Sequence, residues 1–212
     1  MPPADKVIRW PDSPEEQRAV TALAARVLAD GGLVVYPTDT VYGLGADPSN
    51  ARSLQRIFVV KGRPDEKAII WLVESTAMAR RWCTVDARAE RLTARYWPGG
   101  LTLVLRRIDP RSGGLPTLGV RVPAHPAALA IIHAAGGAVA TTSANRSGEP
   151  SARTASEAAA AIGAGVDLIV DGGPSQVGAE STVLDLTVDP PAILRAGAVD
   201  SAEALFLCSS IE

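Results

Sequence analysis

The sequence contains few of the residue types on which several common classes of protein depend. Its 212 residues include only two histidines and two cysteines, and their spacings match neither a zinc site nor a disulfide framework. No apolar run is long enough to cross a membrane, and the first residues lack the apolar core of a signal peptide. We therefore expect a cytoplasmic protein with no membrane partner and no metal site built from its own side chains.

The usual nucleotide-binding and hydrolase fingerprints are also missing. The segment 43–48, Gly-Leu-Gly-Ala-Asp-Pro, has proline where a dinucleotide fingerprint needs its third glycine. There is no Gly-Lys-Ser/Thr of a P-loop and no Gly-x-Ser-x-Gly nucleophile elbow. Covalent catalysis and histidine-based acid–base catalysis are thus disfavoured, and an enzyme of this sequence would depend on positioning and charge stabilisation.

Lysine is scarce as well, and its distribution is informative. Only Lys6, Lys61 and Lys67 occur among 21 cationic residues, and two of the three are six residues apart. With a net charge of −2, 47% hydrophobic and 21% charged residues, the chain has the composition of a folded globular protein. Any concentration of positive charge must therefore be local.

The order of the elements predicts an α/β fold. Capping residues Ser13, Asp86 and Thr154 indicate helix starts, the first and last with Glu three residues later. We expect helices at 14–30, 51–60, 86–97, 126–135 and 154–162. We expect strands at 33–36, 68–73, 101–105, 120–122, 138–142, 168–170, 182–186 and 192–194. This alternation favours a twisted mixed sheet flanked by helices in a single domain.

Five segments place polar or charged side chains where a core would not need them. They are 36–45, 61–67, 117–123, 141–151, and 178–183 together with 195–197. Hydroxyls after a strand, as at 36–45 and 141–151, are typical of ligand sites at the ends of α/β strands, although they also occur in ordinary turns. The cations at 61–67 suit a triphosphate or the end of a helix dipole equally well.

Arg121 stands between apolar neighbours on an expected strand, so its charge needs an anionic partner. A substrate carboxylate and a structural Asp or Glu are both candidates. Taken together, the five segments predict a polar cleft for an anionic, nucleotide-like ligand.

Six motifs in these segments occur in a fixed order. They are Pro-Thr-Asp-Thr-Val-Tyr-Gly-Leu-Gly at 37–45, Lys-Gly-Arg-Pro at 61–64, Trp-Pro-Gly at 97–99, Val-Arg-Val-Pro at 120–123, Ser-Ala-Asn-Arg-Ser-Gly at 143–148 and Ser-Thr-Val at 181–183. In this order the chain resembles the Sua5/YrdC/YciO family of L-threonylcarbamoyladenylate synthases, from about Val20 to Val199.

The resemblance implies a YrdC-like α/β fold with a concave, positively lined cleft. It implies a single domain over residues 1–212, with a core at about 20–199, like the form without the C-terminal extension of the longer branch. It also implies a nucleotidyltransferase that condenses L-threonine, bicarbonate and ATP to threonylcarbamoyl-AMP and pyrophosphate. That product would serve a tRNA-modifying transferase complex that makes N6-threonylcarbamoyladenosine at position 37.

The resemblance further assigns roles to residues in the five segments. The positions that match the L-threonine site are Thr40, Arg121, Thr141 and Ser181, with Arg121 the partner of the carboxylate. The positions that match the ATP site are Arg63, Lys67, Thr117, Ser143, Ser151 and Arg195. Lys61 and Asn145 belong to the same motifs, at the phosphates or supporting that loop. Lys61 and Arg63 are the expected catalytic cations, offsetting phosphate charge together with Mg²⁺.

Two features qualify this assignment. Some family members have proline and histidine where this chain has Ala68 and Leu72, which bears on the threonine pocket. The alternative function is a module that binds tRNA or double-stranded RNA without catalysis. A pI of about 5.8 and 4% aromatic residues argue against RNA as the main ligand.

Overall fold

A computed structural model describes residues 6–62, 69–109 and 115–209. The expected site residues Arg63 and Lys67, and the departure at Ala68, lie outside the described residues.

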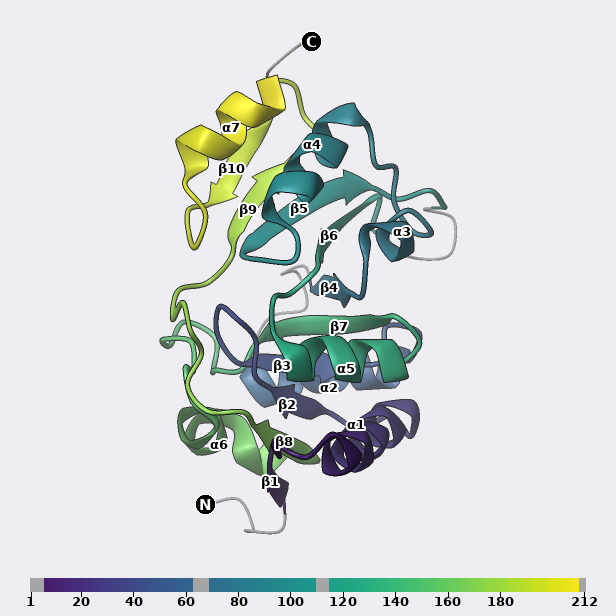
Figure 1. The fold of residues 1–212 in the computed structure, drawn as a ribbon, viewed down its shortest axis with the longest axis vertical. Helices are drawn as coiled ribbons and strands as arrows, with labels where there is room; N and C mark the ends of the chain where they lie inside the picture. The colour runs from purple at the N-terminus through teal and green to yellow at the C-terminus, as the bar shows by residue number, and fades with distance from the viewer. Residues whose placement is uncertain (1–5, 63–68, 110–114, 210–212) are drawn as a thin grey trace.

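The described strands form one 10-stranded mixed sheet in the order β1-β8-β2-β3-β7-β4-β6-β5-β9-β10. The strands are β1 (Val7–Arg9), β2 (Val34–Tyr36), β3 (Gly43–Ala46), β4 (Ile70–Val73), β5 (Leu101–Arg106), β6 (Thr117–Arg121), β7 (Ala138–Ser143), β8 (Leu168–Asp171), β9 (Thr182–Asp185) and β10 (Ala192–Arg195). The sheet contains both parallel pairs, such as β4–β6 and β5–β9, and antiparallel pairs, such as β3–β7. The expected twisted mixed sheet with flanking helices is confirmed (Figure 1).

Helices cover the sheet unequally. They are α1 (Pro14–Ala29), α2 (Ala51–Lys61), α3 (Thr76–Ala79), α4 (Ala87–Tyr96), α5 (Pro126–Ala134), α6 (Ala155–Ile162) and α7 (Ser201–Ser209), with a 3-10 turn at Gly163–Gly165. Around β8, β2, β3 and β7, one core cluster includes residues of α1 and α5, and another includes residues of α2 and α6. Around β5, β6 and β9, a third cluster includes residues of α3, α4 and α7.

The two halves of the sheet meet where β7 pairs with β4. This antiparallel pairing sets Ile70 opposite Thr141 and Leu72 opposite Val139. The segment 172–181 runs from β8 in one half to β9 in the other (Figure 1). Its backbone N–H groups at Val177 and Gly178 donate to the carbonyls of Asp39 and Thr40. The junction of the halves is therefore bordered by the Thr38–Gly43 segment, β4, β6, β7 and this connection.

The structure departs from several of the expected local features. Ser13 is the N-cap residue of α1, but its side chain makes no capping hydrogen bond, whereas Asp86 and Thr154 cap as expected. The strand β6 starts at Thr117 rather than at residue 120. The elements β1, β3, α3 and α7 were not anticipated. Three of them, β1, β3 and α3, have only three or four residues, and β3 is half glycine.

Among the described residues, no helix is both long and apolar enough to cross a membrane.

Candidate functional site

A cavity of about 150 Å³ lies at the junction of the two halves of the sheet. This is small beside the roughly 300–1,000 Å³ of pockets for drug-sized ligands, and it suits a molecule of amino-acid size. Its lining residues come from five of the strands and from the loops beside them: Thr38, Thr40, Val41, Tyr42, Gly43, Ile70, Leu72, Arg121, Thr141, Thr142, Ser143, Glu180, Ser181 and Arg195. All four residues expected at a threonine site are therefore brought together.

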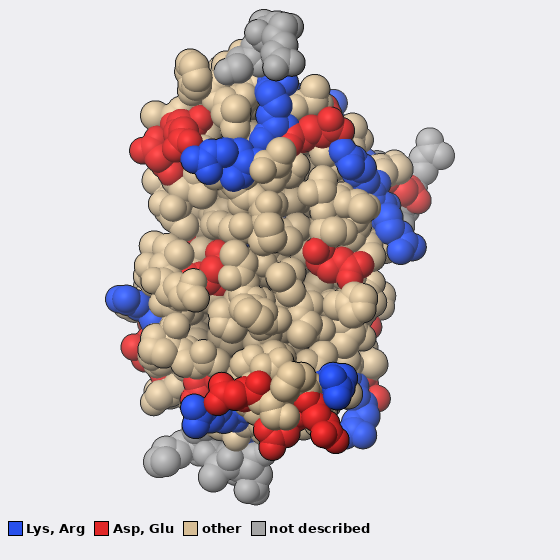
Figure 2. Space-filling model, viewed as in Figure 1, with Lys and Arg blue, Asp and Glu red and all other residues tan. Residues whose placement is uncertain are grey.

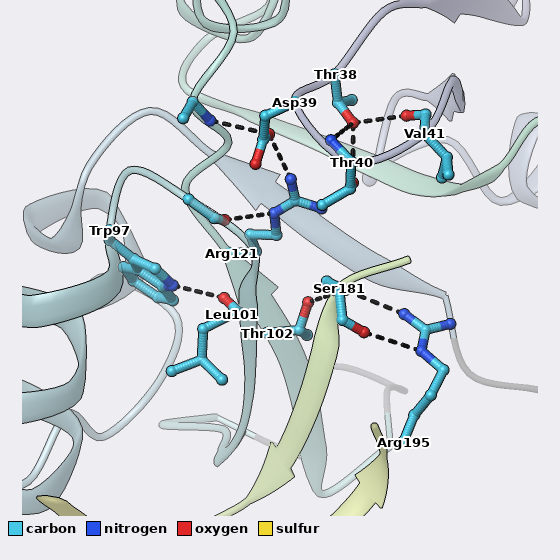
Figure 3. A network of polar contacts seen from close by, with 12 residues as sticks. Thr38, Asp39, Thr40, Val41, Trp97, Leu101, Thr102, Arg121, Ser181 and Arg195 are labelled. Atoms are coloured by element: carbon cyan, nitrogen blue, oxygen red, sulfur yellow. Dashed lines mark hydrogen bonds and ion pairs between the residues drawn. The ribbon is translucent and has the colours of Figure 1, made fainter. Parts of the chain in front are cut away.

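One wall of the cavity is a buried ion pair between Arg121 and Asp39. Their side chains are only 4% and 6% exposed, respectively. The other guanidinium contacts of Arg121 are 2.7 Å bonds to the Thr40 hydroxyl and to the Gly99 carbonyl (Figure 3). The Ala124 N–H also donates to Asp39, at 3.0 Å. Burial lowers the pKa of the Arg121 guanidinium, and the carboxylate of Asp39 opposes that shift.

This pair supplies one of the two partners that the sequence left open for Arg121. Of the two candidate partners, the structural carboxylate is present, 82 residues earlier in the chain. Asp39 had no assigned role in the sequence analysis. The signal that pointed to it was the need of a buried guanidinium for an anion.

The opposite wall is a half-exposed cluster around Arg195. Its guanidinium forms an ion pair with Glu180, and these side chains are 42% and 32% exposed. Arg195 also donates to the backbone carbonyl and the hydroxyl of Ser181, both at 3.0 Å (Figure 3). The Ser181 hydroxyl lies 2.8 Å from that of Thr102, and Ser151 donates to Glu180 at 2.6 Å. Glu180, which the sequence analysis assigned no role, thus links Ser151 to Arg195, and Arg195 in turn contacts Ser181.

Lys61 is buried under the loop that follows β7. Its Nζ donates to the carbonyls of Ser143 and Asn145, the latter at 2.7 Å, and lies 3.2 Å from Asn145 Oδ1. The amide of Asn145 in turn donates to the carbonyls of Arg146 and Glu149. Of the two placements that the sequence allowed for Lys61 and Asn145, these contacts match support of the loop.

Thr117 lies apart from the small cavity. It lines a second hollow of about 1250 Å³, which shares Ile70 and Arg195 with the first. A larger space thus opens beside the amino-acid-sized one.

The expected positive lining is not shown by the described residues. Both cations that line the small cavity, Arg121 and Arg195, are paired with carboxylates. On the face seen in Figure 2, Lys and Arg gather mainly toward the two ends, and the belt between them is mostly uncharged with two acidic groups. Within the described part of the chain, no group of three or more His, Cys, Asp or Glu side chains could hold a metal ion.

The fold and the cavity together define an α/β protein with a small polar ligand site on its sheet. The profile of the Sua5/YciO/YrdC family, described as "Telomere recombination", matches residues 26–197. The chain belongs to this family.

Similar curated proteins and similar solved structures support membership of this family. The threonylcarbamoyl-AMP synthases of Pyrococcus abyssi and Bacillus subtilis are 42% and 40% identical over 85% and 84% of this chain. The chain covers only 55% and 53% of their lengths, about half of each. The crystal structure of P. abyssi Sua5 complexed with L-threonine has a TM-score of 0.87 and 37% identity, covering 97% of this chain and 61% of that one. Escherichia coli YciO has a TM-score of 0.81 and 30% identity, covering 92% and 96%. The YrdC-like fold expected from the motifs is confirmed.

Proposed function

We propose that this protein is an L-threonylcarbamoyladenylate synthase that acts on L-threonine, bicarbonate and ATP. The observation that carries the proposal is the small cavity, which pairs each of its two arginines with a carboxylate and surrounds them with hydroxyls. Such a balanced site suits a zwitterion better than a multiply charged anion, because an added net charge would be left without compensation. The related protein solved with L-threonine, and the relatives named as synthases, support this ligand.

The reaction has two steps. The amino nitrogen of L-threonine forms a bond to the carbon of bicarbonate, releasing water and a proton and leaving a carbamate. A carbamate oxygen then attacks the α-phosphorus of ATP, and the bond from that phosphorus to the bridging oxygen breaks to release pyrophosphate. Neither step needs a protein nucleophile, so positioning and charge stabilisation suffice.

L-Threonine would occupy the small cavity, held by Thr40, Arg121, Thr141 and Ser181. The counter-ion of Arg121 is Asp39, and this ion pair holds the guanidinium in a fixed orientation at the cavity. A guanidinium carries five N–H donors, and three of those of Arg121 are used by Asp39, Thr40 and Gly99. Within residues 6–62, 69–109 and 115–209 no partner is found for the remaining two donors, which would bind a substrate carboxylate.

ATP would lie across the larger hollow, with Thr117, Ser143, Ser151 and Arg195 beside it. Arg63 and Lys67 would bring charge to the phosphates, with Arg63 the direct catalytic cation. We assign Lys61 and Asn145 to holding the backbone of that loop, since Nζ of Lys61 contacts its carbonyls.

Mg²⁺ fits this site only as a companion of the nucleotide. Among the described residues, Glu180 is the one carboxylate in the cavity lining, and it is already paired with Arg195. The ion would therefore be held chiefly by phosphate oxygens and water, and it would neutralise charge on the triphosphate.

The product would pass to a tRNA-modifying transferase complex, and the protein would work in the cytoplasm. RNA binding without catalysis is not favoured, because the relatives are named as synthases. Contact with tRNA or double-stranded RNA would be an accessory property.

The test is pyrophosphate release from the purified chain incubated with ATP, L-threonine and bicarbonate. We expect release that depends on both L-threonine and bicarbonate, with L-threonine binding measurable by calorimetry. Reactions without either co-substrate, and with D-threonine, are the matched controls. Release that ignores L-threonine, combined with no calorimetric binding, would refute the synthase assignment.

A further inference from the structure

Tyr36 has a buried hydroxyl that is hydrogen-bonded to a residue of the cavity lining. It lies at the end of β2 with no exposed surface, and the lining includes Thr141 but not Tyr36. Its hydroxyl is 2.6 Å from the hydroxyl of Thr141 on β7, with β3 between the two strands. Tyr36 is therefore a group behind the cavity wall, in direct contact with a residue of that wall.

Two glycines of β3 make this contact possible. Gly43 is paired with Tyr36, and Gly45 is paired with Thr141. A Cβ at Gly45 would stand 2.7 Å from Cε1 of Tyr36, and a Cβ at Gly43 would stand 2.9 Å from Cγ2 of Thr141. Any side chain at either position would displace the tyrosine ring or the threonine. The Gly-x-Gly of the first motif thus opens a path for the ring across β3.

The direction of the hydrogen bond follows from the available acceptors. Burial raises the pKa of Tyr36 far above its ordinary value, so the phenol keeps its proton. Thr141 is the only hydrogen-bond partner of that hydroxyl among the described residues, so Tyr36 donates to Thr141. Thr141 directs its own proton to the carbonyl of Val139, at 3.1 Å. One lone pair of the Thr141 hydroxyl remains as an acceptor, and Thr141 is a residue of the cavity lining.

The surroundings of Thr141 indicate which part of an amino acid meets that acceptor. Ile70 lies directly opposite Thr141 in the sheet, and both Ile70 and Leu72 line the cavity. The charged side chains of the lining among the described residues are Arg121 on β6, Glu180 in the connection before β9 and Arg195 on β10. Leu72 is paired with Arg121 on β6, so a substrate carboxylate belongs on that side of β4. The uncharged side chain of the substrate then lies at the Ile70–Thr141 pair, where neither lining residue carries a charge.

We propose that Tyr36 is a positioning residue for substrate selection: it fixes the Thr141 hydroxyl as an acceptor that recognises the side-chain O–H of L-threonine. This rests on the proposed function, since it names how that substrate is distinguished from its isostere. L-Valine has the same shape with a methyl group in place of the hydroxyl. A site built to bond a hydroxyl rejects an analogue without one, because its buried polar group is left unpaired.

The test compares dissociation constants of L-threonine and L-valine by calorimetry on the full chain. We expect the wild type to prefer L-threonine by at least about tenfold. Tyr36→Phe keeps the ring but frees the Thr141 hydroxyl to turn, so we expect the preference to fall by about threefold or more. Thr141→Val removes the acceptor and should lower the preference at least as far. Tyr96→Phe, on α4 outside the cavity lining, is the matched control and should leave the ratio unchanged.

The double variant Tyr36→Phe/Thr141→Val separates positioning from a general structural effect. If Tyr36 acts through Thr141, the double variant should keep the ratio of Thr141→Val alone, within about twofold. Multiplying effects, or a Tyr36→Phe ratio equal to that of the wild type while the wild type still prefers L-threonine, would overturn the proposal alone. A wild type that binds neither amino acid would instead overturn the proposed function, and the proposal with it.

Discussion

Arg121 and Arg195 line the same cavity, but one side chain is buried and the other is half-exposed. The side chain of Arg121 is 4% exposed and that of Arg195 is 42% exposed, although each is paired with a carboxylate. Arg121 is tied to three separate parts of the chain, through Asp39, Thr40 and Gly99. Among the described residues, the side-chain hydrogen bonds of Arg195 go to Glu180 and Ser181, which are neighbours in sequence. Arg121 therefore connects segments that are far apart in the sequence, whereas Arg195 is bonded to one short segment.

The difference in burial separates structural roles from exchangeable ones. Removing one member of a buried ion pair leaves the other charge without water or partner, which is costly. A half-exposed pair is screened by solvent, so its members can change partners at little cost. We therefore expect the Arg121 wall to keep its contacts when ligand binds, whereas Arg195 can exchange part of its contact with Glu180 for a ligand anion.

The largest effect should come from breaking the buried wall with Arg121→Met. Asp39 would be left buried without its counter-ion, and the free energy of unfolding should fall by about 3–5 kcal/mol. Urea denaturation followed by circular dichroism measures the change. Arg56→Met is the matched control, because the Arg56–Asp167 pair is exposed by 36% and 39% and should contribute about 1 kcal/mol or less.

A loss below about 1 kcal/mol for Arg121→Met would contradict the structural role of the buried pair. Asp39→Asn separates charge from shape in the same wall. It keeps an acceptor for the Ala124 N–H while removing the negative charge, so it should also destabilise the fold.

The same contrast shows what the sequence could and could not predict. Asp86 and Thr154 were recognisable as helix caps because capping is local, and both make the expected hydrogen bonds. The strand β3 was not recognised, since two of its four residues are glycines that serve the close approach of Tyr36 and Thr141. Asp39 was not assigned to Arg121 because a contact across 82 residues leaves no local pattern. The chemical class of the partner was predictable, but its identity required the fold.

Lys61 belongs with Arg121 in this comparison, as a second buried cation with committed partners. Lys61→Met would leave the carbonyls of Ser143 and Asn145 without their donor, so the free energy of unfolding should fall by about 1–3 kcal/mol. Lys6→Met is the control, because Lys6 is only partly buried and donates to the single carbonyl of Val166, at 2.8 Å. It should cost less than Lys61→Met in the same denaturation experiment.

Lys61→Met also tests the placement of this residue beneath the loop. Residual synthase activity per folded molecule should be reduced through a displaced loop, with the KM for ATP raised. A variant that keeps wild-type stability yet loses activity completely would contradict the supporting role and favour direct contact with the phosphates.

The smallest effect on stability, and the clearest on ligand binding, should come from Arg195→Gln. Because the Arg195–Glu180 pair is half-exposed, the free energy of unfolding should change by about 1 kcal/mol or less. A lost charge-assisted contact with ligand costs about 1.5–3 kcal/mol, so the KM for ATP should rise by about tenfold or more. Arg56→Gln removes an equally exposed pair away from the cavity and should leave KM unchanged. An Arg195→Gln enzyme with wild-type KM would mean that both walls of the cavity are structural. A loss of stability as large as that of Arg121→Met would show that exposure does not distinguish the two arginines.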